Sequence, residues 1–115
     1  MEEKELIEIG KKAYVLSEQI GELEQAMKNR EEAISGYPSH AKTFNSVLDK
    51  AKKLLEVDPT ILETIFHLSS HDPNKKYGYK DFEGLKCDLA TLKAALKSFF
   101  VFHFPKKEKG RIGFI

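Results

Sequence analysis

The sequence predicts a mainly α-helical protein, a single domain over residues 1–115 folded as a small bundle of about four helices. Apolar residues recur every three to four positions through most of the chain, a spacing that places them on one face of a helix. The chain has 115 residues, of which 41% are hydrophobic, and this suffices for one buried core but not for two.

The clearest helix is expected over residues 3–35. Its apolar residues alternate spacings of three and four over four heptads, which is typical of a coiled-coil seam. The seam consists of Leu6, Ile9, Ala13, Leu16, Ile20, Leu23, Met27 and Ile34. A long helix of this kind must bury its seam, either against a second copy of the chain or against other helices of the same chain. Both alternatives stay open, and the assembly contacts we expect are Leu16, Ile20, Leu23 and Met27.

Three further helices are expected, over residues 40–57, 59–70 and 81–99. Each repeats the spacing of three and four in its apolar residues. The seam of the helix over 81–99 has the same period as the seam of the first helix, so we expect these two helices to pack antiparallel.

Glycine, proline and capping residues mark the boundaries between these helices. Gly36 and Pro38 are expected to end the first helix, because glycine suits a left-handed cap and proline cannot continue the hydrogen-bond ladder. Ser39 is the expected N-cap of the second helix. Asp58 and Pro59 form the sharpest boundary, with aspartate as the N-cap and proline in the first turn of the third helix.

Residues 100–115 fit a short C-terminal β-hairpin, which is slightly favoured over a continuation of the last helix. Aromatic residues alternate with Val101 and His103 as in a strand, residues 105–110 suit a turn, and residues 111–115 supply a second short run. Either arrangement leaves an aromatic cluster that some other surface must cover.

Charge and cysteine content narrow the class of protein. The formal net charge of +1 is lower than is usual for a protein that coats nucleic acid. Residues 1–35 carry nine acidic and five basic residues, whereas residues 36–115 carry nine acidic and fourteen basic residues, a split that can favour packing between subunits. The single cysteine excludes an internal disulfide, and together with the lack of a secretory signal or a membrane-spanning apolar run it favours the cytoplasm.

The sequence holds no pattern typical of an enzyme. Its seven glycines are scattered, without a phosphate-binding loop or a nucleophile elbow, and Cys87 has no evident activating base. We therefore expect a non-catalytic protein-interaction or regulatory protein without a cofactor. It is expected to be a homo-oligomer, with a dimer favoured, that presents helix faces to a further protein partner.

A nucleic-acid-associated protein is the first alternative. The loop over residues 75–80 and the tail over residues 104–111 interleave basic and aromatic residues, as single-strand binders do for phosphates and bases. The candidate contacts are Lys75, Lys76, Tyr77, Tyr79, Lys106, Lys107 and Arg111. Because the last helix separates the two segments by roughly 25 Å or more, they form one surface only if the fold or a second subunit joins them.

A metal-binding helical protein is the second alternative. His67 and His71 are four residues apart, which on one helix places both rings on the same face, and Asp72 follows directly. A single histidine at the C-terminal end of a helix is the simpler interpretation of His71.

Two short segments resemble peptide-binding or peptide-docking motifs. Residues 51–59 resemble the junction between tetratricopeptide repeats, whose helix pairs bind peptides, although no second copy follows at the period of 34 residues. Residues 93–100 resemble the peptide that sliding-clamp partners insert into the clamp. Leu96, Phe99 and Phe100 match its hydrophobic positions and Lys93 replaces its usual glutamine. Packing in the core is the alternative for these three hydrophobic residues.

Overall fold

The fold is that of a computed structural model, which describes residues 2–74 and 79–104. Within these residues the secondary structure is helical and contains no strand, so the prediction of a mainly helical bundle is confirmed. The elements are α1 (Glu3–Ala26), α2 (Arg30–Ser35), α3 (Tyr37–Leu54), the 3₁₀ turn η1 (Leu55–Val57), α4 (Pro59–Ile65) and α5 (Tyr79–His103).

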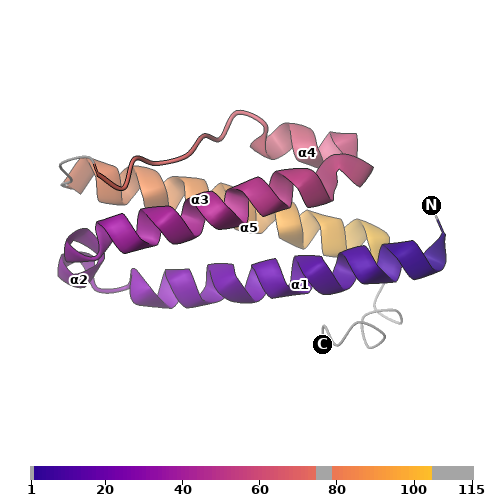
Figure 1. The fold of residues 1–115 in the computed structure, drawn as a ribbon, viewed down its shortest axis with the longest axis horizontal. Helices are drawn as coiled ribbons and strands as arrows, with labels where there is room; N and C mark the ends of the chain where they lie inside the picture. Colours follow the sequence, from indigo (N-terminus) through magenta and orange to yellow (C-terminus); the bar gives the residue numbers. More distant parts are fainter. Residues whose placement is uncertain (1, 75–78, 105–115) are drawn as a thin grey trace.

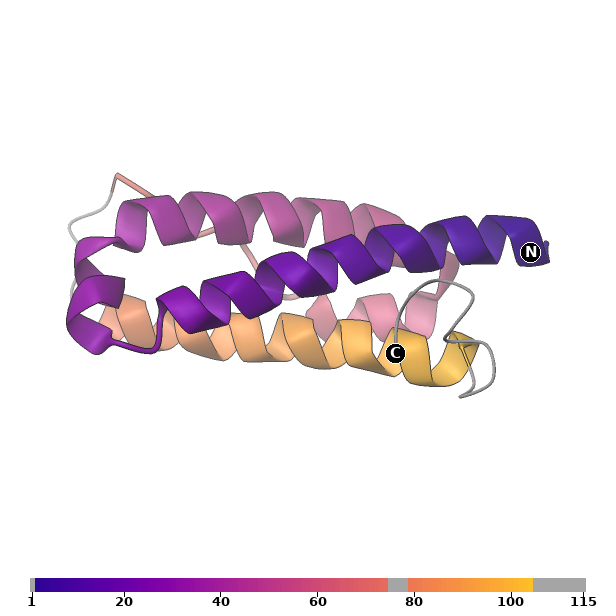
Figure 2. The same cartoon turned by 90° about the horizontal axis from the view of Figure 1, so that it is seen from below.

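Three long helices, α1, α3 and α5, form the bundle (Figure 1). α1 packs against α3 and α5 and runs antiparallel to both, as the matching seams of the first and last helices predict. α4 covers one end of the bundle against α5, and residues 66–74 return along its outside. The first turns of α1 extend past the ends of α3 and α5 (Figure 2).

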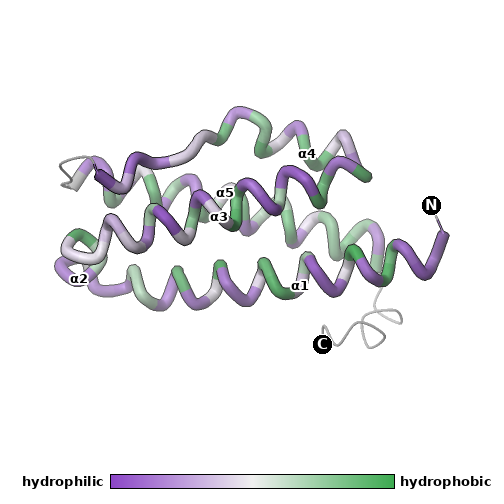
Figure 3. Tube along the Cα trace, in the orientation of Figure 1, coloured by the Kyte–Doolittle hydropathy of each residue, from purple (hydrophilic) through white to green (hydrophobic). Residues whose placement is uncertain are grey.

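One hydrophobic cluster joins all the helices. Figure 3 shows hydrophilic and hydrophobic residues alternating along α1 and α3, and the apolar members face the interior of the bundle. The bulkiest fully buried side chains belong to Tyr37, Phe44, Phe99 and Phe100, from α3 and α5. Burial of such rings dominates the energy of a small core.

The helix expected over residues 3–35 is divided between α1 and α2. The amide of Met27 still donates to the carbonyl of Leu23 at 3.0 Å, but the amide of Lys28 donates only three residues back, to Gln25. Asn29 then adopts an extended backbone, and its Oδ1 accepts a hydrogen bond from the amide of Glu32 at 3.1 Å. Asn29 is thus a helix N-cap, and this cap begins a new helix in a new direction.

The remaining boundaries follow the sequence in part. Asp58 caps α4 as predicted, since its Oδ1 accepts from the amide of Ile61 at 3.2 Å. Gly36, by contrast, has a φ of −90° and does not form a left-handed cap, and α3 begins at Tyr37 rather than after Ser39. α4 ends at Ile65, five residues before the expected end at residue 70.

The hairpin expected over residues 100–115 is not found where the structure describes the chain. Residues 100–103 continue α5, and the amide of Phe104 donates to the carbonyl of Phe100 at 2.9 Å. A helix is favoured over a strand here because Phe99, Phe100 and Phe104 fall on one face of the helix and are buried together. Phe102, on the opposite side, is 73% exposed. Residues 105–115 lie outside the described residues.

Candidate functional site: a lysine-rimmed groove between α1 and α3

The four residues expected to make assembly contacts lie inside the core of a single chain. Leu16, Ile20, Leu23 and Met27 each expose 5% or less of their surface. Their seam is covered by α3 and α5, which is the second of the two alternatives that the sequence left open. Their side chains are therefore not available to a second copy in this arrangement, and any interface must use another face.

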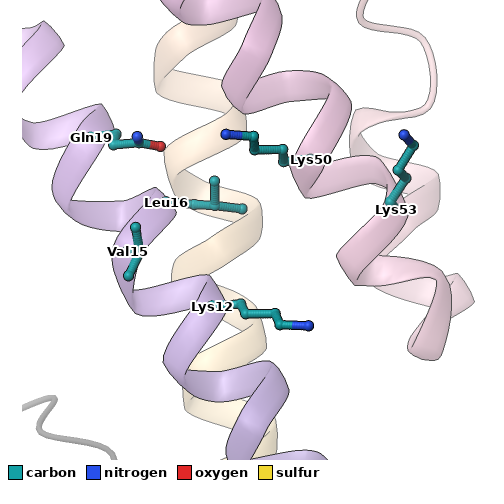
Figure 4. A pocket seen from close by; sticks show the side chains of 6 residues that line it. All are labelled: Lys12, Val15, Leu16, Gln19, Lys50 and Lys53. Carbon is teal, nitrogen blue, oxygen red and sulfur yellow. The ribbon is translucent and has the colours of Figure 1, made fainter.

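Beside this seam, α1 and α3 enclose an open groove with a volume of about 360 Å³ (Figure 4). Its lining residues are Lys12, Val15, Leu16, Gln19, Lys50 and Lys53. Leu16 reaches into the core, whereas Val15 is 55% exposed although it is aliphatic. The groove thus has an apolar floor that water still contacts.

Three lysines form the rim of the groove. Lys12 comes from α1, and Lys50 and Lys53 come from successive turns of α3 (Figure 4). Lys53 forms an ion pair with Asp49 at 3.5 Å, but both side chains are more than 70% exposed and such pairs contribute little. Within the described parts of the chain, Lys12 and Lys50 form no ion pair.

Gln19 adds one polar side chain to the lining of the groove. Its Oε1 is buried without a hydrogen-bond partner in the described structure. Figure 4 shows Lys50 reaching across from α3 toward this side chain. An apolar floor and a cationic rim together suit a ligand that combines carboxylates with apolar surface.

The metal site expected at His67 and His71 does not form on a helix. α4 ends at Ile65, so the two rings do not share a helical face. The Nε2 of His71 lies 2.7 Å from Oδ2 of Asp88 on α5, and its Nδ1 lies 3.3 Å from the hydroxyl of Tyr37 on α3. Both ring nitrogens are engaged, while Asp72 is exposed and its Oδ1 accepts from the amide of Asn74.

Over residues 2–74 and 79–104, no group of three or more histidine, cysteine, aspartate or glutamate side chains is placed to hold a metal ion. His71 instead serves as an anchor. Its backbone amide donates to Oδ1 of Asn45 at 2.8 Å, and its carbonyl accepts from Nδ2 of Asn45 at 2.7 Å. The anchor holds the irregular segment after α4 against α3 and α5, and the sequence alone did not indicate it.

Two more polar contacts lie at the other end of the bundle, near the C-terminal ends of α3 and α5. Asp58 Oδ2 lies 2.7 Å from Nε2 of His103, and this hydrogen bond is the main reason that the pKa of Asp58 is lowered. Lys52 donates to the carbonyl of Leu68 at 2.5 Å, and so satisfies a main-chain group in the turn that follows α4. These contacts position α4 relative to α3 and α5.

The candidate nucleic-acid contacts lie almost entirely outside the described residues. Lys75, Lys76, Tyr77, Lys106, Lys107 and Arg111 belong to this group. Tyr79 begins α5, and the helix runs the length of the bundle from there to His103. The nucleic-acid hypothesis stays a prediction.

The hydrophobic residues of the segment that resembles a sliding-clamp peptide are part of the core. Leu96, Phe99 and Phe100 are each 2% exposed or less, so a clamp could reach them only if α5 left the bundle.

None of the helices in the part of the chain that the structure describes is long and apolar enough to cross a lipid bilayer.

Comparison of the chain with protein-family models, with curated proteins and with solved structures found no match. The geometry of the groove is therefore the basis for a functional proposal.

Proposed function

We propose that this chain is a non-catalytic protein-interaction module that self-associates, with the α1–α3 groove at the contact. The half-exposed Val15 beneath the lysine rim carries the proposal. An aliphatic floor surrounded by charge matches the apolar centre and polar rim of protein interfaces. Covering Val15 removes apolar surface from water, which is the main favourable contribution to association.

The charge of the groove specifies what kind of surface can cover it. Lys12 and Lys50, without ion-pair partners among the described residues, attract acidic side chains and repel basic ones. The chain carries such acidic side chains at the start of α1, where Glu3 and Glu5 fall in the first turn. A second copy therefore supplies a partner of suitable charge. The exposed, unpaired thiol of Cys87 is consistent with work in a reducing cytoplasm.

Sedimentation equilibrium over protein concentrations from about 1 µM to about 1 mM tests the proposal. We expect the average mass to rise from that of the 13.1 kDa chain toward twice that value, with a micromolar dissociation constant. A constant mass of one chain at every concentration would refute self-association.

A further inference from the structure

A second stripe of α1 carries both signs of charge in a fixed order. Glu5, Glu8, Lys12, Val15 and Gln19 follow one another at spacings of three, four, three and four, so they share one face of the helix. We call these five residues the acid–base strip. All except Gln19 are exposed, and the last three line the groove beside α3.

We propose that two copies associate by packing their acid–base strips antiparallel about a twofold axis that lies between Glu8 and Lys12. This inference rests on the proposed self-association and names the surface that makes it. Glu8 of each copy then faces Lys12 of the partner subunit. Glu5 faces Val15 of the partner subunit, at the mouth of the groove.

The order of residues in the strip sets the direction of packing. With the twofold axis between Glu8 and Lys12, Glu8 of one copy lies opposite Lys12 of the other, and Glu5 lies opposite the lysine-rimmed groove. The symmetry repeats both contacts, so each occurs twice. A parallel pairing in register would instead place Glu8 against Glu8 and Lys12 against Lys12 of the partner subunit, where like charges repel. Of these two arrangements, only the antiparallel one places each acidic residue opposite a basic residue or the lysine-rimmed groove.

The groove on α3 extends the contact beyond two helices. In this arrangement the carboxylate of Glu5 lies over the groove of the partner subunit. Val15, Lys50 and Lys53 of the partner subunit all line that groove, so both lysines are near the carboxylate. Among the described residues, Glu8 forms an ion pair only with Lys11, at 3.7 Å, and both side chains are more than half exposed. Such an exposed pair is weak enough to exchange for a new partner.

The position of the strip in the fold supports the same partner. The first turns of α1 extend past the ends of α3 and α5, so they are open to a second α1 and can reach the α3 rim of the partner's groove (Figure 2). The overlap of residues 2–18 is about 25 Å long at 1.5 Å per residue. A helix pair of this length, together with the α3 rim, suits a weak and concentration-dependent dimer.

Charge reversal tests the proposal. Glu8→Lys makes the strip basic and Lys12→Glu makes it acidic, so each variant alone should show a dissociation constant at least about tenfold weaker than the wild type. An equimolar mixture of the two variants should form a mixed dimer at least as strong as the wild type, because every facing pair is again opposite in charge. The double variant E8K/K12E should also recover the dimer.

Lys42→Glu is the matched control, because Lys42 is an exposed lysine of α3 away from the groove. It should leave the dissociation constant unchanged. Far-UV circular dichroism of each variant should show the wild-type helix content, since Glu8 and Lys12 are both exposed.

The possible results test separately whether the chain self-associates and whether the acid–base strip is the interface. If the wild type dimerises but E8K and K12E dimerise equally well, the strip is not the interface and self-association stands. If the two variants fail alone and also fail when mixed, the antiparallel pairing is refuted. If the wild type stays a single chain at about 1 mM, both the strip and the proposed function fail.

Discussion

Gly21→Ala is expected to stabilise the protein and Gly10→Ala is not, although both substitutions replace a glycine inside α1. A Cβ at Gly21 would have no atom within 4 Å. A Cβ at Gly10 would lie 2.9 Å from Cε2 and 3.2 Å from Cε1 of Phe104, and closer still to Cζ. Gly10 is thus where the end of α5 approaches the backbone of α1.

The magnitudes follow from two opposing effects. Replacing a helical glycine by alanine contributes about 0.5–1 kcal/mol of stability, because the unfolded chain loses freedom and the helix is favoured. Gly21→Ala should gain that amount. At Gly10 the added methyl must displace the ring of Phe104, which is 2% exposed and packs against Phe99 and Phe100. Overpacking of this kind costs about 1–3 kcal/mol, so the two variants should differ by that amount.

Thermal unfolding followed by circular dichroism measures both variants against the wild type. Gly21→Ala should raise the midpoint of thermal unfolding by about 4 °C, and Gly10→Ala should lower it or leave it unchanged. If Gly10→Ala is as stabilising as Gly21→Ala, the ring of Phe104 does not approach the backbone of α1 in solution, and the reasoning is refuted.

Three further substitutions test the contacts around α4. Asn45→Ala should cost about 1–3 kcal/mol in urea unfolding, because the two backbone bonds to His71 are lost together; an unchanged midpoint would contradict the anchor. Lys52→Met should speed amide exchange at residues 66–70, and equal exchange rates would show that its carbonyl contacts are not formed. Asp58→Asn keeps the N-cap acceptor but loses the charged carboxylate that His103 contacts, so it should cost about 1 kcal/mol at pH 7. The hydrogen bond from His103 lowers the pKa of Asp58, so the stability lost in Asp58→Asn should shrink as the pH falls through that lowered pKa. A loss of stability that does not depend on pH would refute the role of this hydrogen bond.

The sequence predicted the buried face of the bundle because burial depends on periodicity. Leu16 and Ile20 on α1 and Leu96 and Phe99 on α5 lie at helical spacing and are buried together. The sharp start of α4 at Asp58 was also readable, since an N-cap followed by proline acts locally.

The break after α1 was not readable from periodicity. Met27 and Ile34 are seven residues apart, so the apolar pattern continues across the turn as if the helix did. The Asn29 side chain decides the outcome through one hydrogen bond to the amide of Glu32. Asparagine followed three residues later by glutamate is a capping signal that, in retrospect, marks this boundary.

The groove was missed for a different reason. The exposed charges of α1 fit a solvated face, and the sequence gives no sign that Lys50 and Lys53 of α3 lie beside Lys12. Only the antiparallel packing of α1 on α3 brings them together. The contact between His71 and Asp88 was missed for the same reason, since the two residues are 17 positions apart and no sequence pattern places one beside the other.

The parallel course of α3 and α5 has a consequence for the order in which the protein assembles. α1 and α3 are joined through the short α2, so their contacts close a small loop and can form early. α5 can dock only after residues 55–74 have traversed the bundle, which adds closure entropy to the last step. During synthesis, when the N-terminal part emerges first, we therefore expect a two-helix platform to exist before α5 arrives to seal it.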